Sequence, residues 1–149
     1  MNAKQKKFIL NKLIPFILRE EGRGFAMEVW KIKEEVGEKL WLDGVPRDVP
    51  VCGTAACIGG SVQCLLHPRA KHDMGYGKLA AELGLSLEQT HGLFYEWNVE
   101  DMDDSGAHWP KRFANQFEKA ATPLGKAKVA VALLKEVVKT NGKCLEAKS

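Results

Sequence analysis

Four residues in the middle of the chain have the types and spacing of a metal or thiol site. Cys52 and Cys57 are five positions apart, and Cys64 is followed three positions later by His67. Thiolate sulfur and imidazole nitrogen are preferred ligands of zinc, which takes four of them in a tetrahedron. The spacing therefore makes these four residues a candidate metal site, although such pairs usually lie on turns and these fall on or beside a predicted helix.

The same cysteines also have a structural explanation. Free cysteine is often a small core residue, and a chain of 149 residues is long enough to bury thiols in a core. A nucleophile is a further alternative, because a helix N-terminus favours the thiolate of Cys52 or Cys57. Nothing in the sequence brings a histidine to either thiol. We therefore name no catalytic residue, expect no cofactor, and favour a protein that is not an enzyme.

A second candidate site is basic and lies towards the C-terminus. Residues 110–149 carry nine bases and three acids, whereas residues 43–109 carry four bases and ten acids. Clustered basic residues attract phosphates and acidic partners. The residues that would bind nucleic acid or an acidic partner are Lys111, Arg112, Lys128, Lys135, Lys139 and Lys143. The alternative is that the basic ends and the acidic middle neutralise one another within the molecule.

The first half of the chain carries weak signals for the elements that position these residues. Residues 4–20 have apolar side chains at helical spacing, and Pro15 should kink that helix or divide it. Residues 28–41 show a second, weaker helical pattern. Asp43-Gly44 then marks a turn, and we expect the residues up to 51 to be extended without predicting a sheet.

The most distinctive segment runs from Cys52 to Leu66. We expect Thr54 to cap a helix in which almost every residue is apolar or small. A helix that is apolar on all sides must be surrounded by protein, and glycines let a neighbour approach closely. The structural motif is formed by Cys52, Gly53, Thr54, Cys57, Gly59 and Gly60. We therefore predict a buried central helix over residues 54–66.

The second half of the chain has clearer helix boundaries. Ser86 and Gln89 have the spacing of a capping box, in which each side chain bonds the other residue's main-chain N–H. The final helix should begin after Thr122 and end near Asn141. These patterns predict a mainly α fold, a compact single-domain bundle of five to seven helices over residues 1–149, with a disordered tail at about 143–149.

Membrane and export signals are weak in this sequence. No apolar run approaches the roughly 18 residues that a membrane helix needs. The basic N-terminal segment does not match a secretory signal, because Asn11, Lys12 and Pro15 interrupt its apolar stretch. We expect a cytoplasmic protein with no membrane partner.

The motif Cys-Gly-Thr-x-x-Cys-Ile-x-Gly at residues 52–60 is accompanied by further short matches along the chain. These are Phe25, Met27 and Trp30, residues 83–89 with Leu93 and Phe94, Trp109-Pro110, and residues 120–142. In these segments the chain resembles a family of small uncharacterised proteins of bacteria and their phages. It departs from that pattern by a longer stretch at about 31–50 and by Gly60-Ser61. The resemblance implies a helical fold and a bacterial or phage setting, and it supplies no catalytic residues.

The sequence leaves three functions open. The first is a non-enzymatic interaction protein of bacterial or phage origin that modulates a host protein, with the partner unknown. The second is nucleic-acid binding through the basic C-terminal helix. The third is a cysteine-dependent or metal-dependent enzyme.

Overall fold

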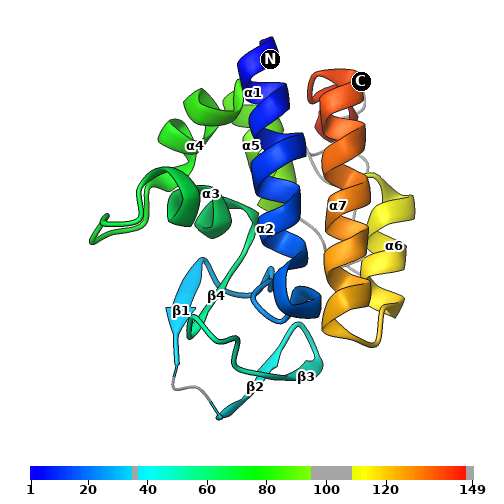
Figure 1. The fold of residues 1–149 in the computed structure, drawn as a ribbon. Coiled ribbons are helices and arrows are strands. Elements are labelled where there is room, and N and C mark those ends of the chain that lie inside the picture. Colours follow the sequence, from blue (N-terminus) through cyan, green and yellow to red (C-terminus); the bar gives the residue numbers. More distant parts are fainter. Residues whose placement is uncertain (35–36, 95–108, 147–149) are drawn as a thin grey trace.

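The computed structural model describes residues 1–34, 37–94 and 109–146, which form an α+β fold (Figure 1). Helices predominate, but the described residues also form two antiparallel two-stranded sheets. The prediction of a mainly α helical bundle is therefore wrong. The helices lie together on one side, and the sheets lie beneath them at one end of the molecule (Figure 1).

A continuous helical column forms the N-terminal part. It consists of α1 (Ala3–Phe8), a π-helical turn η1 (Ile9–Leu13), α2 (Ile14–Leu18) and a 3-10 turn η2 (Arg19–Gly22). The irregularity expected at Pro15 is the π-helical turn just before it, where the Ile14 N–H donates to the Ile9 carbonyl, five residues back. Proline cannot donate a main-chain hydrogen bond, so the regular pattern is interrupted there.

The helix predicted over residues 28–41 is wrong, because this stretch contributes strands to both sheets. Strand β1 (Lys31–Lys33) pairs with β4 (Thr54–Ala56), and β2 (Lys39–Leu42) pairs with β3 (Val45–Asp48). The turn between β2 and β3 has both central residues in the left-handed region, Asp43 at φ 53° and Gly44 at φ 74°. Such a two-residue turn matches the twist of paired strands, so the pairing overrides the helical spacing.

The helix predicted over residues 54–66 begins four residues later than expected. Helix α3 runs Ile58–Leu66, and its N-cap is Cys57, whose sulfur accepts the Gly60 N–H at 3.4 Å. Thr54 does not cap it, because the main chain of residues 54–56 is paired with β1. Residues 58–63 are buried, whereas Leu66 at the C-terminal end is exposed.

The remaining helical elements of the described residues are α4 (Gly75–Leu83), α5 (Leu87–Phe94), α6 (Lys111–Lys119), α7 (Pro123–Thr140) and a 3-10 turn η4 (Lys143–Leu145). Of these, α5 and α7 begin directly after the predicted caps, Ser86 and Thr122. The capping box is confirmed, with the Ser86 N–H donating to Gln89 Oε1 and the Gln89 N–H donating to Ser86 Oγ, both at 3.0 Å. The Thr122 cap is also confirmed, since its hydroxyl accepts the Gly125 N–H at 3.0 Å.

One apolar core joins the N-terminal column, α3 and α7, and α7 runs antiparallel beside the column (Figure 1). Its largest fully buried side chains include Ile9, Leu13, Ile17, Phe25, Ile58, Leu79, Leu93, Trp109, Phe117 and Leu134. Burying one such side chain contributes about 1.5–3 kcal/mol. Residues 143–145, which the sequence placed in a disordered tail, form η4 with Leu145 fully buried in this core.

Candidate functional site

The first half of the cysteine motif forms a tight turn that leads into β4. The Gly53 N–H donates to the Pro50 carbonyl at 2.8 Å, and the Gly53 carbonyl accepts the Glu34 N–H at 2.7 Å. Gly53 has φ +74°, and a Cβ there would lie 2.8 Å from the Glu34 carbonyl oxygen. Both the conformation and the close approach require glycine at this position.

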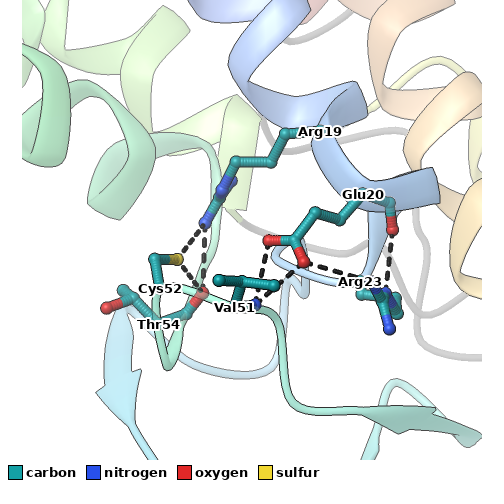
Figure 2. A network of polar contacts seen from close by, with 6 residues as sticks. All are labelled: Arg19, Glu20, Arg23, Val51, Cys52 and Thr54. Carbon is teal, nitrogen blue, oxygen red and sulfur yellow. Dashed lines mark hydrogen bonds and ion pairs between the residues drawn. The ribbon is translucent and has the colours of Figure 1, made fainter. Parts of the chain in front are cut away.

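A polar network fastens this turn to the end of the N-terminal column (Figure 2). The Arg19 guanidinium donates to the Phe16 carbonyl at 2.8 Å and to the Thr54 carbonyl at 3.1 Å, and its Nη2 lies 4.0 Å from Cys52 Sγ. Cys52 itself is exposed. The motif therefore presents a solvent-accessible thiol beside a guanidinium.

A second set of polar contacts in the same network is made by Glu20. Its carboxylate accepts the Val51 N–H at 2.8 and 3.1 Å and pairs with Arg23 at 3.1 Å (Figure 2). Glu20 and Glu21 both have left-handed backbone conformations, at φ 49° and φ 58°. Non-glycine residues rarely adopt this conformation, so the hydrogen bonds to Val51 and Arg23 help to hold the strained turn.

The second half of the motif packs closely against Trp30. A Cβ on Gly60 would lie 1.7 Å from the Trp30 carbonyl oxygen, and a Cβ on Gly59 would lie 2.5 Å from the Trp30 ring. The indole N–H donates to Gln63 Oε1 at 3.1 Å. The glycines thus allow a close neighbour, as expected, and that neighbour is an aromatic residue with its main chain.

The thiol chemistry of the motif differs from the sequence expectation. Burial raises the pKa of Cys57 to about 11, because the loss of solvation outweighs the hydrogen bonds from the Gly60 and Gly59 N–H groups. Burial also raises the pKa of Cys64. A buried thiol of this kind is a poor nucleophile near neutral pH. At Cys57 the geometry favours the structural explanation.

The four candidate metal ligands do not converge. Cys57 is buried as the N-cap of α3, Cys52 is exposed, Cys64 is half-buried, and His67 Nε2 lies 3.0 Å from Glu82 Oε1. Across residues 1–34, 37–94 and 109–146, no group of three or more His, Cys, Asp or Glu side chains has a geometry that would hold a metal ion. The spacing in the sequence is therefore not reproduced as a ligand set in space.

The basic candidate residues lie on the outside of α6, α7 and η4. Lys128, Lys135, Lys139 and Lys143 are exposed, as are Lys111 and Arg112. Arg112 is partly neutralised, since its guanidinium lies 3.5 Å from the Glu136 carboxylate. At helical spacing Lys128, Lys135 and Lys139 share one face of α7. The structure therefore brings these three lysines together in a row.

A network of buried charges at the β2–β3 turn was missed by the sequence analysis. The Asp43 carboxylate accepts the N–H groups of Met27 at 2.7 Å and Glu28 at 2.8 Å, and the Asp43 N–H donates to Glu28 Oε2 at 2.9 Å. Arg47, also buried, donates to the Phe25 and Leu42 carbonyls. Burial raises the pKa of Asp43 despite these hydrogen bonds. The sequence signal there was only the Asp-Gly turn.

Lys126 was also missed, because it looked like one more surface lysine of α7. Its exposed fraction is only 4%, its Nζ donates to the Phe117 carbonyl, and Nζ lies 4.6 Å from the centroid of the Phe117 ring. Burial lowers the pKa of Lys126. Lys126 and Asp43 both line a cavity of about 750 Å³. Oppositely charged, buried side chains at a cavity are typical of binding sites.

The third feature that the sequence did not indicate is an exposed tryptophan. Trp41 on β2 is 70% exposed and lies directly opposite Pro46 on β3. Its neighbours along the strands alternate, so Leu42 and Val45 point into the protein while Trp41 and Pro46 face solvent. An aromatic side chain this exposed is an uncommon use of apolar surface.

Comparisons with known proteins add no family assignment. No family model matches the chain, and neither a curated protein nor a solved structure matches it. The resemblance to a bacterial and phage family therefore stays a prediction. Within the part of the chain that the structure describes, no helix is both long and apolar enough to cross a membrane.

Proposed function

We propose that this chain is a non-enzymatic binding protein whose ligand is a nucleic acid. The proposed contact surface, here called the basic face, consists of Lys4 and Lys7 on α1 together with Lys128, Lys135 and Lys139 on α7, all of them exposed. The observation that carries the proposal is the packing of the N-terminal column against α7, with lysines and almost no acids on the exposed sides of both.

The position of the two helices supports a shared surface. The N-terminal column and α7 lie side by side and run in opposite directions (Figure 1). Each buries its opposite side in the same core, at Ile9 and Leu13 on one helix and at Leu134 on the other. Because both inner sides face this core, the exposed sides of the column and of α7 face away from it and toward solvent.

The lack of opposing charge supports the same conclusion. Residues 1–19 contain no acidic residue, and Glu136, the single acid of α7, is already paired with Arg112 at 3.5 Å. From Lys128 to Lys139 the helix rises about 16 Å at 1.5 Å per residue. A row of lysines over that length can neutralise several phosphates of one strand, which are spaced at about 3.4 Å along the duplex axis.

The test is salt-dependent binding of labelled duplex DNA and single-stranded RNA, measured by fluorescence anisotropy. Each lysine that neutralises a phosphate contributes about −0.9 to the slope of log K against log salt for duplex DNA. The triple variant Lys128→Gln, Lys135→Gln, Lys139→Gln should therefore bind at least about tenfold more weakly at low salt, with a slope shallower by roughly 2–3.

A control variant removes the same charge elsewhere. Lys33, Lys71 and Lys78 are exposed and lie outside the basic face. Changing these three to Gln should alter affinity by no more than about twofold. Absence of binding at low salt, or equal losses in both triple variants, would overturn the proposal.

A protein partner at the β2–β3 hairpin is the second candidate function, favoured by the 70% exposure of Trp41. Tryptophan residues dominate the binding energy of many protein interfaces. The bacterial or phage setting and a host target would fit this function. In this case a photo-crosslinking residue at position 39, which leaves Trp41 in place and lies on the same exposed side of β2, should give one defined adduct in a bacterial lysate. Excess unlabelled wild-type chain should suppress that adduct, whereas excess Trp41→Ala chain should not.

The control for this second test is Leu87, another exposed apolar residue, 56% exposed at the start of α5. A crosslinker at position 87 should not capture the same species. Adducts of equal pattern at positions 39 and 87 would indicate unspecific contact and count against the hairpin as an interface.

A further inference from the structure

We propose that the cavity between the β2–β3 turn and the α6–α7 connection binds a small zwitterion of the free α-amino-acid class. The cavity has a volume of about 750 Å³, which lies within the roughly 300–1,000 Å³ of small-molecule sites. This inference is independent of the nucleic-acid proposal, because the cavity shares no residue with the basic face.

Charges of opposite sign lie on different walls of the cavity. Glu28 and Asp43 line the cavity beside the β2–β3 turn, and Lys119 and Lys126 line it on the side of α6 and α7. Glu118 adds one further carboxylate on the helical side. A ligand with a single charge would be attracted by one wall and repelled by the other. A molecule with an ammonium group and a carboxylate can face both walls with complementary charge.

The two buried charges in the cavity still have capacity for a ligand. Asp43 is 9% exposed and Lys126 is 4% exposed. Among the residues that the structure describes, neither takes part in an ion pair within 4.0 Å. Lys126 has three ammonium protons, and the Phe117 carbonyl accepts one. Each Asp43 oxygen accepts one main-chain N–H and retains a second lone pair. A zwitterion can pair with both.

The start of α7 favours the same orientation of the ligand. Lys126 lies in the first turn of this 18-residue helix, where the helix dipole attracts negative charge. The ligand carboxylate is therefore placed at the Lys119 and Lys126 side, and its ammonium group at the Glu28 and Asp43 side. The apolar lining from Val45, Pro46, Ala120 and Ala121 remains for the ligand side chain.

The test uses defined probes and the full chain. The twenty free L-amino acids are screened individually at about 10 mM for a rise in the melting temperature, and any hit is titrated by calorimetry. The hit is then compared with its N-acetyl derivative, which lacks the ammonium charge, and with its carboxamide, which lacks the carboxylate. We expect both derivatives to bind at least about tenfold more weakly than the free amino acid.

Variants of the cavity provide the second arm. Lys126→Met should weaken binding of the free amino acid at least about tenfold and bring its affinity close to that of the carboxamide, because Lys126 contacts only the ligand carboxylate. Lys78→Met, an exposed lysine on α4, is the matched control and should bind like wild type. If Lys126→Met does not fold, Glu118→Gln and Lys119→Gln, both at exposed positions, replace it as the variants of the cavity. The proposal is wrong if no amino acid binds, or if the two blocked derivatives bind as well as the free form.

Discussion

Glu28 and Asp43 each accept a hydrogen bond from the main-chain N–H of the other. The Glu28 N–H donates to Asp43 Oδ1 at 2.8 Å, and the Asp43 N–H donates to Glu28 Oε2 at 2.9 Å. This exchange ties together two residues that are 15 positions apart in the chain. It resembles a helix capping box in its reciprocity, but here it joins the β2–β3 turn to the stretch that precedes β1.

This exchange predicts a graded series of stabilities. Asp43→Ala should lower the free energy of unfolding by about 2–3 kcal/mol, because it leaves the Met27 and Glu28 N–H groups without an acceptor. Asp43→Asn should cost less, since asparagine keeps one acceptor oxygen and tolerates the left-handed conformation. Urea unfolding followed by circular dichroism measures both. Equal losses in the two variants would show that the hydrogen bonds do not hold this turn.

Gly60→Ala should be severely destabilising, by at least about 3 kcal/mol. The new Cβ would lie 1.7 Å from the Trp30 carbonyl oxygen, and a main-chain atom cannot rotate away. The control is Gly77→Ala on α4, where nothing lies within 4 Å of the added Cβ. That variant should be about 0.5–1 kcal/mol more stable than wild type, because alanine favours the helix. Thermal unfolding of both variants gives the comparison, and a mild effect at Gly60 would refute the close contact.

The cysteines should react in an order set by their surroundings. Cys52 is exposed, whereas Cys57 is buried with a pKa raised to about 11, so its thiolate is scarce near neutral pH. With a chromogenic disulfide reagent, we expect Cys52 to react first and Cys57 only when the protein unfolds. Peptide mass mapping at successive times identifies each site. Cys52→Ser should remove the fast phase, and a fast phase that persists in this variant would contradict the assignment.

Lys126 should make stability increase with pH on the alkaline side. Its folded-state pKa is lowered by burial, so below its ordinary pKa the unfolded chain binds this proton more strongly than the folded chain. Raising the pH towards the ordinary lysine pKa therefore increases the free energy of unfolding. Lys126→Met removes this contribution. In urea unfolding at about pH 7 and about pH 9.5, the wild type should gain stability relative to the variant. An unchanged difference would show that Lys126 is not desolvated.

Local signals in the sequence were sufficient to place the starts of α5 and α7. The Ser86 and Gln89 capping box and the Thr122 cap are interactions between residues three positions apart, so they can be predicted from the sequence alone. The helix predicted over residues 28–41 was wrong because the apolar spacing there fits either a helix or a strand. Pairing with a distant segment decides between the two. Ile32 pairs with Ala55, and no local pattern encodes that pairing.

The candidate sites could be predicted only where exposure follows from helical spacing. The row formed by Lys128, Lys135 and Lys139 was predicted from the sequence and is exposed. Lys126 belongs to the same helix but points inward to the Phe117 carbonyl, and its residue type gives no warning of this. The four candidate metal ligands lie apart for a similar reason, because Cys57 caps a helix and His67 pairs with Glu82. Spacing along the chain did not determine direction in space.

The junction between residues 24–30 and the start of α3 has a consequence for synthesis. The Ala26 N–H donates to the Ala56 carbonyl, and the Cys57 N–H donates to the carbonyls of Val29 and Trp30. During translation the earlier segment leaves the ribosome before residues 56 and 57 do. Its hydrogen-bonding groups therefore stay hydrated until those residues have also emerged, and the N-terminal half can complete its folding only from that point.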